Sequence, residues 1–118
     1  KNSEIWLDEG KFEVKLPDEI YEAVKNYINK EVILGIRPQH IYDRLYCTFA
    51  TPETTLTATV EMIELLGDKK ILHLTTGKSR FTCVVDIHNQ VQKGQDIDVV
   101  LDVTKIHLFD KETELTII

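Results

Sequence analysis

The segment from Leu56 to Leu66 constrains the fold of this chain more than any other part of the sequence. It begins with a strict alternation that divides the side chains into an apolar and a polar set: Leu56, Ala58, Val60 and Met62 against Thr57, Thr59 and Glu61. A period of two is typical of a β-strand that buries one face. Gly67 and Asp68 then predict a tight turn, so we expect one long strand that leads into a hairpin.

Three further strand-like segments follow this turn, at 70–75, 81–85 and 97–103, and glycine-containing turns separate them. The last segment alternates apolar residues with an acidic face that includes Asp96, Asp98 and Asp102. Consecutive short strands joined by tight turns suit a small closed barrel of the OB type better than an open sheet. We therefore predict a mainly β fold, an OB-fold-like small β-barrel with one short helix near the N-terminus.

That helix belongs to the N-terminal part of the chain. Two short strands at 4–7 and 12–15 flank Gly10 and predict a hairpin. The residues from Asp18 to Tyr27 show helical spacing, with Asp18 as the expected N-cap, and 31–36 then forms a strand that Pro38 ends. We expect a single domain over 1–118, in which 1–53 holds the hairpin, helix and first motif strand, and 54–118 holds the barrel strands and a C-terminal tail.

Charge and composition exclude several classes of protein. The net charge is −6 and the estimated pI about 5.1, so the overall field repels phosphate backbones and nucleic acid is an improbable partner. No apolar run approaches the length that spans a bilayer, and no signal peptide is evident. Met62 is the only methionine, so we expect this chain to be a piece of a longer protein.

The sequence contains no motif for catalysis, cofactor binding or metal binding. A GxxxxGK[ST] phosphate loop is absent, as are GxSxG, HExxH and GxGxxG. The four histidines have no partner at metal-ligand spacing, and Cys47 and Cys83 are expected to be free thiols that serve as small hydrophobic residues. We therefore expect no catalytic residue, no cofactor and no metal in this chain.

Three segments resemble a known family. Residues 32–41 read VILGIRPQHI, residues 60–74 read VEMIELLGDKKILHL, and residues 107–114 read HLFDKETE. In this order and spacing they are similar to the region that follows the nucleotide-binding domain in ABC import ATPases of the maltose and glycerol-phosphate type, often called a transport-associated OB (TOBE) domain. Gln39 departs from the family pattern, which usually has Glu or Asp there.

The resemblance implies a non-catalytic regulatory and dimerisation domain of a sugar importer's ATP-binding subunit. Its implied partners are a second copy of that subunit, the membrane permease subunits and, in some relatives, a regulatory protein. ATP and magnesium would bind in the preceding ATPase domain, and the location would be cytoplasmic, at the inner face of the membrane. The candidate structural or interface residues lie within the three motifs: Gly35, Arg37, Pro38, Glu64, Gly67, His107 and Phe109.

Two other functions stay open at this point. A ligand-sensing barrel that binds a sugar or a small oxyanion is the alternative, although the acidic face at 96–102 argues against an anion there. Binding of single-stranded nucleic acid would need a basic groove with stacking aromatic residues, and the sequence supplies neither at sufficient density.

The alternation in the long strand also predicts a specific contact. It places Glu64 on the same apolar face as Val60 and Met62, where an unpaired carboxylate would be costly. Arg37 could satisfy that carboxylate with two parallel hydrogen bonds and so join two of the motifs. The alternative is a β-bulge near Ile63 that turns Glu64 outward.

Overall fold

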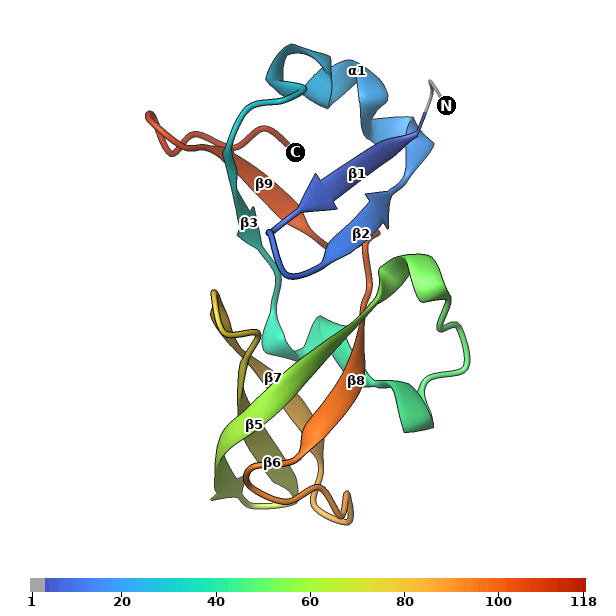
Figure 1. The fold of residues 1–118 in the computed structure, drawn as a ribbon, viewed down its shortest axis with the longest axis vertical. Helices are drawn as coiled ribbons and strands as arrows, with labels where there is room; N and C mark the ends of the chain where they lie inside the picture. The colour runs from blue at the N-terminus through green and yellow to red at the C-terminus, as the bar shows by residue number, and fades with distance from the viewer. Residues whose placement is uncertain (1–3) are drawn as a thin grey trace.

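The computed structural model describes residues 4–118, apart from the side chain of Tyr46. In this part of the chain nine strands form three sheets, joined by turns and a few short helical segments. The molecule is elongated, with extents of 42 × 29 × 24 Å, and two modules are stacked along its long axis (Figure 1). The prediction of a mainly β fold with one short helix near the N-terminus is confirmed.

The cap module comprises residues 4–36 and 103–118, so both ends of the described chain lie in it (Figure 1). Two separate two-stranded antiparallel sheets, β1 with β2 and β3 with β9, form its framework. Its elements in chain order are β1 (Ile5–Asp8), β2 (Glu13–Leu16), η1 (Asp18–Ile20), α1 (Tyr21–Val24), η2 (Lys25–Tyr27), β3 (Val32–Gly35) and β9 (His107–Asp110). The β1–β2 hairpin is the predicted one, and Gly10 in its turn has a φ of 109°, a conformation that favours glycine.

The expected helix over Asp18–Tyr27 is present but broken into three pieces. A single α-helical turn, α1, lies between the 3₁₀ turns η1 and η2. The prediction that Asp18 caps the helix is wrong, because Pro17 occupies the N-cap position and no side chain caps the first turn. Proline has the extended backbone that an N-cap needs, which leaves Asp18 in the first turn itself.

The barrel module comprises residues 37–102 and contains a five-stranded antiparallel sheet in the order β4-β8-β5-β6-β7. Its elements are η3 (Pro38–His40), β4 (Ile41–Asp43), η4 (Arg44–Tyr46), η5 (Pro52–Thr54), β5 (Thr55–Leu66), β6 (Lys69–Thr75), β7 (Arg80–Asp86) and β8 (Asp96–Leu101). The long strand and the three segments after it are thus found where the sequence predicts them. The sheet curls until its end strands β4 and β7 approach each other, but they form no ladder within the described residues, so the barrel is nearly closed.

The parts 1–53 and 54–118 are consecutive along the sequence, but they do not coincide with the cap module and the barrel module. Strand β4 precedes it and pairs with β8, whereas β9 follows it and pairs with β3. The last segment of the chain therefore returns to the cap module, as the red strand beside β3 shows in Figure 1.

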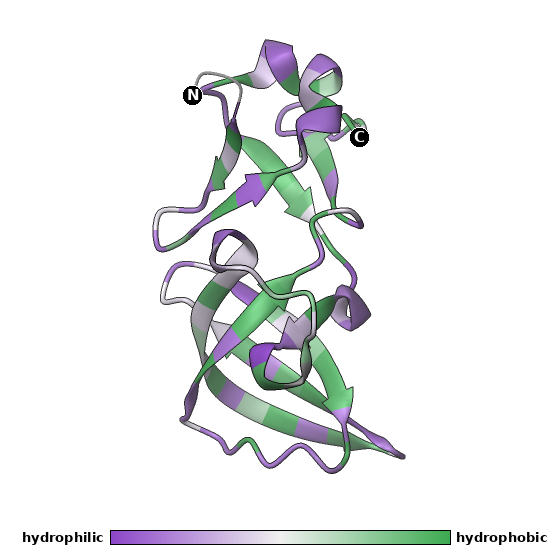
Figure 2. Cartoon of the chain, turned by 90° about the vertical axis from the view of Figure 1, so that its right-hand side faces the viewer, coloured by the Kyte–Doolittle hydropathy of each residue, from purple (hydrophilic) through white to green (hydrophobic). Residues whose placement is uncertain are grey.

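Each module has its own hydrophobic core, and the apolar faces of the strands supply most of both (Figure 2). The barrel core buries the residues that the alternation selects up to Val60, together with Leu72, Leu74 and Cys83. The cap core is smaller and contains Ile5, Leu16, Val24, Ile106 and Leu108. Three half-buried residues pack against both cores and so connect the modules: Leu7, Ile36 and Val103.

The C-terminal tail turns back on β9 through Asp110. The backbone N–H groups of Glu112 and Thr113 donate to Asp110 Oδ1, and the Tyr27 hydroxyl donates to Oδ2 at 3.0 Å. These bonds stabilise the charged carboxylate and hold the pKa of Asp110 below its ordinary value. The tail is thereby tied to η2 across the module.

We predict that Tyr27→Phe raises the pKa of Asp110 towards its ordinary value, because one of the bonds that favour the carboxylate is lost while the two backbone bonds remain. The carboxyl ¹³C chemical shift of Asp110, followed against pH, measures this directly. A group with a depressed pKa loses its stabilising contribution as the pH falls through that pKa, so the tail of the variant should loosen at a higher pH. Tyr21→Phe, which removes the hydroxyl of an exposed tyrosine that has no bond to Asp110, is the control, and equal pKa values of Asp110 in both variants would contradict the assignment.

Candidate functional site

The first and third motifs meet as neighbouring strands. Gly35 of β3 lies opposite His107 of β9 in the antiparallel pair, and Ile33 lies opposite Phe109. The Phe109 ring packs so closely over Gly35 that a Cβ atom there would lie 2.9 Å from Phe109 Cε2. Gly35, His107 and Phe109 thus form one cluster, and the glycine is required by the approach of the ring.

Arg37 and Pro38 follow this cluster directly and form the crossing from the cap module to the barrel module. Arg37 has an extended backbone and is the N-cap of η3, and Pro38 is the first residue of that turn. The Arg37 side chain is exposed, and no acidic group of the described residues lies within ion-pair distance of it. Its guanidinium is therefore available to a partner outside this chain.

The predicted pair of Glu64 with Arg37 is wrong. The Glu64 side chain is 54% exposed, and its Oε1 lies 2.5 Å from Nε2 of His73 on the neighbouring strand. A register shift between Val60 and Met62 is the reason, because the extra residue exchanges the faces of the strand beyond it. Met62 accordingly is 47% exposed, and the outward-turned Glu64 is the alternative that the sequence left open, with the bulge slightly earlier than Ile63.

Gly67 lies in the turn between β5 and β6, apart from the cluster around Gly35. Its φ of 60° explains a glycine at this position, and no atom lies near enough to contact an added Cβ. Glu64 and Gly67 thus mark the tip of the β5–β6 hairpin, while the other five candidates gather in the cap module and at the crossing. The structure divides the candidate residues into these two groups.

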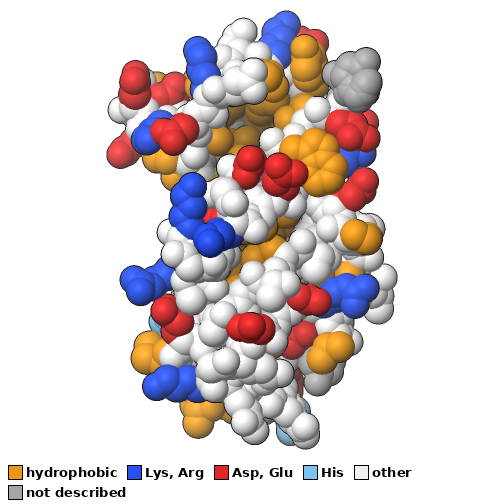
Figure 3. Space-filling view, viewed as in Figure 1, with side chains coloured by type: hydrophobic (Ala, Val, Ile, Leu, Met, Phe, Trp, Pro, Cys, Tyr) orange, Lys and Arg blue, Asp and Glu red, His pale blue; other side chains and the backbone are white. Residues whose placement is uncertain are grey.

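A cavity of about 470 Å³ lies at the waist between the modules. Figure 3 shows hydrophobic side chains at the base of this hollow, halfway down the molecule. Glu9 at its rim accepts a hydrogen bond from Thr76 Oγ1 at 2.8 Å, which ties the β1–β2 turn to the β6–β7 turn. Burial would raise the pKa of Glu9, but hydrogen bonds from the side chains of Ser79 and Thr76 outweigh that effect and lower it.

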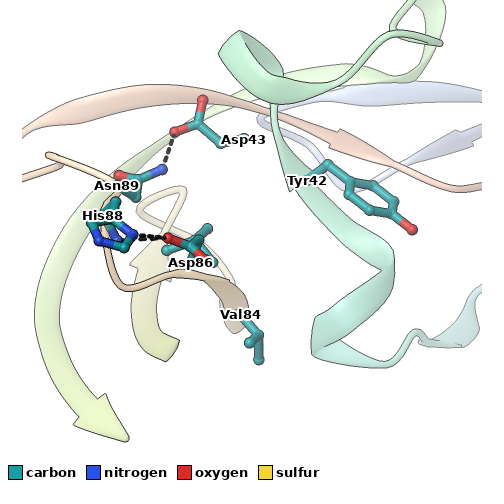
Figure 4. Close-up of a pocket in the computed structure, with 7 residues that line it drawn as sticks. Tyr42, Asp43, Val84, Asp86, His88 and Asn89 are labelled. Carbon is teal, nitrogen blue, oxygen red and sulfur yellow. Dashed lines mark hydrogen bonds and ion pairs between the residues drawn. The ribbon is translucent and has the colours of Figure 1, made fainter. Parts of the chain in front are cut away.

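A second cavity, of about 480 Å³, opens where β4 and β7 diverge (Figure 4). Asp43 and Asn89 form a buried polar pair on its wall, with Asn89 Nδ2 donating to Asp43 Oδ2 at 2.9 Å. Asp86 and His88 lie at the rim and bond to each other at 2.8 Å. Sequence analysis singled out none of these residues, because only the curling of the sheet brings Tyr42 and Asp43 beside Val84 and Asp86.

Groups of three or more side chains that could hold a metal ion are absent from residues 4–118. The Cys83 thiol is buried, which raises its pKa to about 12, and its Sγ donates to the Ile41 carbonyl at 3.2 Å. A thiol with so high a pKa is a poor nucleophile at neutral pH. The described part of the chain therefore offers surfaces and cavities for binding, and its buried cysteine has a packing role.

Family models match the two parts of the chain in turn. The model described as the TOBE domain matches residues 34–109, which begin on β3 and end on its partner β9. The chain belongs to the TOBE domain family. The model described as the MalK OB fold domain matches residues 1–41 and so covers the hairpin, the helical turns and β3.

Several curated proteins are similar to this TOBE domain. The trehalose/maltose import ATP-binding protein MalK of Thermococcus litoralis is 38% identical over 111 residues, which cover 92% of this chain and 30% of that protein. The oligosaccharides import ATP-binding protein MsmX of Bacillus subtilis is 36% identical over 79% of this chain and 26% of its own length. The multiple sugar-binding transport ATP-binding protein MsmK of Streptococcus mutans is 37% identical over 79% of this chain and 25% of its own length. The chain thus spans less than a third of the length of these relatives.

We predict that Gly35→Ala destabilises the domain by about 1–3 kcal/mol, because the added Cβ forces the Phe109 ring out of its packing position. Denaturant unfolding of the single variants and of the combination with Phe109→Leu measures the coupling between the two positions. Gly35→Ala should cost clearly less when Phe109 is already leucine. Additive costs in the double variant would show that the ring contact is not the reason for the glycine.

Proposed function

We propose that this TOBE domain is a non-catalytic regulatory and dimerisation domain in the ATP-binding subunit of an ABC importer for sugars or related solutes. The observation that carries the proposal is the match to three sugar-import ATP-binding proteins, over 79–92% of this chain but less than a third of their length. A domain of this size leaves most of such a subunit, including its nucleotide-binding part, to other residues. Its contribution is then contact and regulation, and ATP and magnesium would bind elsewhere in the subunit.

The proposed partners are a second copy of the subunit, the membrane permease subunits and a regulatory protein. Within the residues that the structure describes, no helix is long and apolar enough to cross a membrane. The proposed location is the cytoplasmic face of the membrane, where the domain is held through the rest of its complex. Arg37 is the proposed contact to the second copy, since its exposed guanidinium lies at the crossing between the modules.

The alternative function, binding of a sugar or a small oxyanion, can be compared with the two cavities. Carboxylates line both of them, Asp8 and Glu9 at the waist and Asp43 and Asp86 at the other cavity. At the cavity beside β7 this negative charge disfavours an oxyanion by repulsion, whereas Arg80 also lines the waist cavity and offsets part of the negative charge there. A neutral sugar avoids that repulsion, so maltose and sulfate, titrated separately while amide chemical shifts are recorded, distinguish the two ligand classes.

We predict that the isolated chain does not bind Mg-ATP, so that titration calorimetry shows no measurable heat of binding. The physical reason is that the sequence holds no phosphate loop to cradle the phosphates. Binding in the micromolar range would contradict the proposal of a non-catalytic domain, because it would require a nucleotide site within these 118 residues.

We also predict weak self-association of the isolated chain, seen as a monomer–dimer equilibrium in sedimentation over a concentration series. Small interfaces bind weakly. This chain would be less than a third of the proposed subunit, so the isolated chain lacks the contacts that the rest of the subunit would add. Arg37→Glu should shift the equilibrium towards monomer, whereas Lys93→Glu, an equal charge change at an exposed turn of the barrel module, should not. A strict monomer at all concentrations, or equal effects of both variants, would contradict the proposed contact.

A further inference from the structure

Strand β7 is an edge of the five-stranded sheet. It pairs with β6 on one side, and the sheet order places β4 at the opposite end. The curl of the barrel brings β4 towards β7 without a ladder between them. One side of β7 therefore carries backbone groups that no strand of the described residues satisfies, and unpaired backbone groups at a sheet edge can pair with another chain.

The hydrogen-bond pattern identifies those backbone groups. At one end of the β6–β7 ladder the Thr76 N–H donates to the Ser79 carbonyl, and at the other the Ile87 N–H donates to the Asp68 carbonyl, both at 3.0 Å. Hydrogen-bonded positions alternate along an antiparallel pair, so residues 81, 83 and 85 bond to β6. The backbone N–H and C=O groups of Thr82 and Val84, and the N–H of Asp86, point away from β6.

The beginning of this edge lies against η3 and β4, whereas its end at Val84–Asp86 borders the cavity. The Cys83 thiol donates to the Ile41 carbonyl and bridges the two strands at that level. Beyond it β4 ends at Asp43 and the chain leaves in η4, so the two strands diverge and the cavity of about 480 Å³ opens beside β7. Figure 4 shows Val84 and Asp86 facing this opening from one side and Tyr42 and Asp43 bounding it from the other.

Apolar and acidic side chains line the cavity beside β7. Tyr42, Val84 and Val85 supply apolar surface. Of the two lining carboxylates, Asp43 is buried and bonded to Asn89, whereas Asp86 is exposed. Lys70 lies nearby and donates to the Asn89 carbonyl. Hydrogen bonds from the backbone N–H and the ring of His88 hold the pKa of Asp86 below its ordinary value, so this carboxyl is charged at neutral pH. A ligand that fills the cavity is therefore favoured if it carries positive charge beside apolar groups.

We propose that the edge of β7 at Val84–Asp86 is a strand-addition site for an extended peptide segment of a partner protein. The free N–H and C=O groups repeat with the spacing of a peptide backbone, and an added strand satisfies them in series, as in other cases of β-augmentation. The occupant carries a lysine or arginine, which pairs with the exposed Asp86, flanked by apolar side chains that cover Tyr42 and Val84. Only a few residues can pair along this short edge, so the complex is a transient one.

The probe for this site is the capped peptide Val-Lys-Val-Lys-Val, titrated into the isotope-labelled chain with amide chemical shifts and hydrogen exchange as readouts. The amides of Val84 and Asp86 should shift and become protected from exchange. Cys83 and Val85, already bonded to β6, should show little new protection. This alternation along one strand distinguishes a backbone ladder from loose contact with the cavity.

Two control peptides test the chemistry of the occupant. The same peptide with every backbone nitrogen methylated keeps the side chains but has no N–H donors, and it should bind at least about tenfold more weakly. Val-Glu-Val-Glu-Val keeps the backbone donors and reverses the charge, and it should also bind at least about tenfold more weakly. A methylated peptide that binds as well as the parent overturns the ladder, and an acidic peptide that binds as well overturns the proposed charge preference.

Matched protein variants test the location. Asp86→Asn removes a carboxylate at the edge and should weaken binding, while Asp98→Asn removes an exposed carboxylate on β8, where it accepts from Thr57, and should not. Val84→Pro removes an outward N–H that β6 does not use; if that variant fails to fold, Val84→Arg places a repelling charge at the same position. No shift at millimolar parent peptide, or equal affinity in the Asp86 and Asp98 variants, overturns the proposal.

Discussion

The pairing of β3 with β9 is the interaction on which the rest of the structure depends. It joins Val32–Gly35 to His107–Asp110 and so brings the end of the chain back to the cap module after the whole barrel has been formed. The close approach of Phe109 to Gly35 fixes this pair, and Leu108 between the two aromatic positions anchors it in the cap core. Without this contact the cap module would lack one of its two sheets.

The waist cavity and the cavity beside β7 differ in character because they form at different places in the domain. At the waist, the modules are joined by Leu7, Ile36 and Val103, by Val14 of β2, which is buried in the barrel core, and by the bond of Glu9 with Thr76, and a hollow is left beside these contacts. At the seam of the barrel, β4 is too short to accompany β7 along its length. A barrel whose end strands pair along their whole length has no free edge. In this barrel β7 retains a free edge, and the cavity beside it has both polar and apolar lining residues.

If the proposed role in a transporter subunit is correct, such surfaces matter more for this TOBE domain than a catalytic centre would. Arg37 at the crossing and the edge of β7 at Val84–Asp86 are the two contact surfaces proposed for this domain. The proposed regulation would need only weak contacts, because other parts of the proposed subunit would hold the complex together.

The sequence by itself determined the class of the fold and the position of nearly every strand, because a period of two and a glycine in a turn act over a few neighbouring residues. It also determined the family, since three motifs keep their order and spacing. It did not determine the face of Glu64, because one extra residue between Val60 and Met62 reverses all positions beyond it and leaves no mark in the alternation before it. The interruption of the helix at 18–27 was likewise not evident from its spacing alone.

Only the tertiary structure decided which distant segments become neighbours. The bond of Asp43 to Asn89 and the open edge at Val84 depend on how far the five-stranded sheet curls, whereas the approach of Gly35 to Phe109 depends on the pairing of β3 with β9. That curl results from the packing of Ile41, Leu72 and Cys83 in one core. Packing of this kind sums contacts from the whole chain, whereas sequence patterns report the environment of one segment at a time.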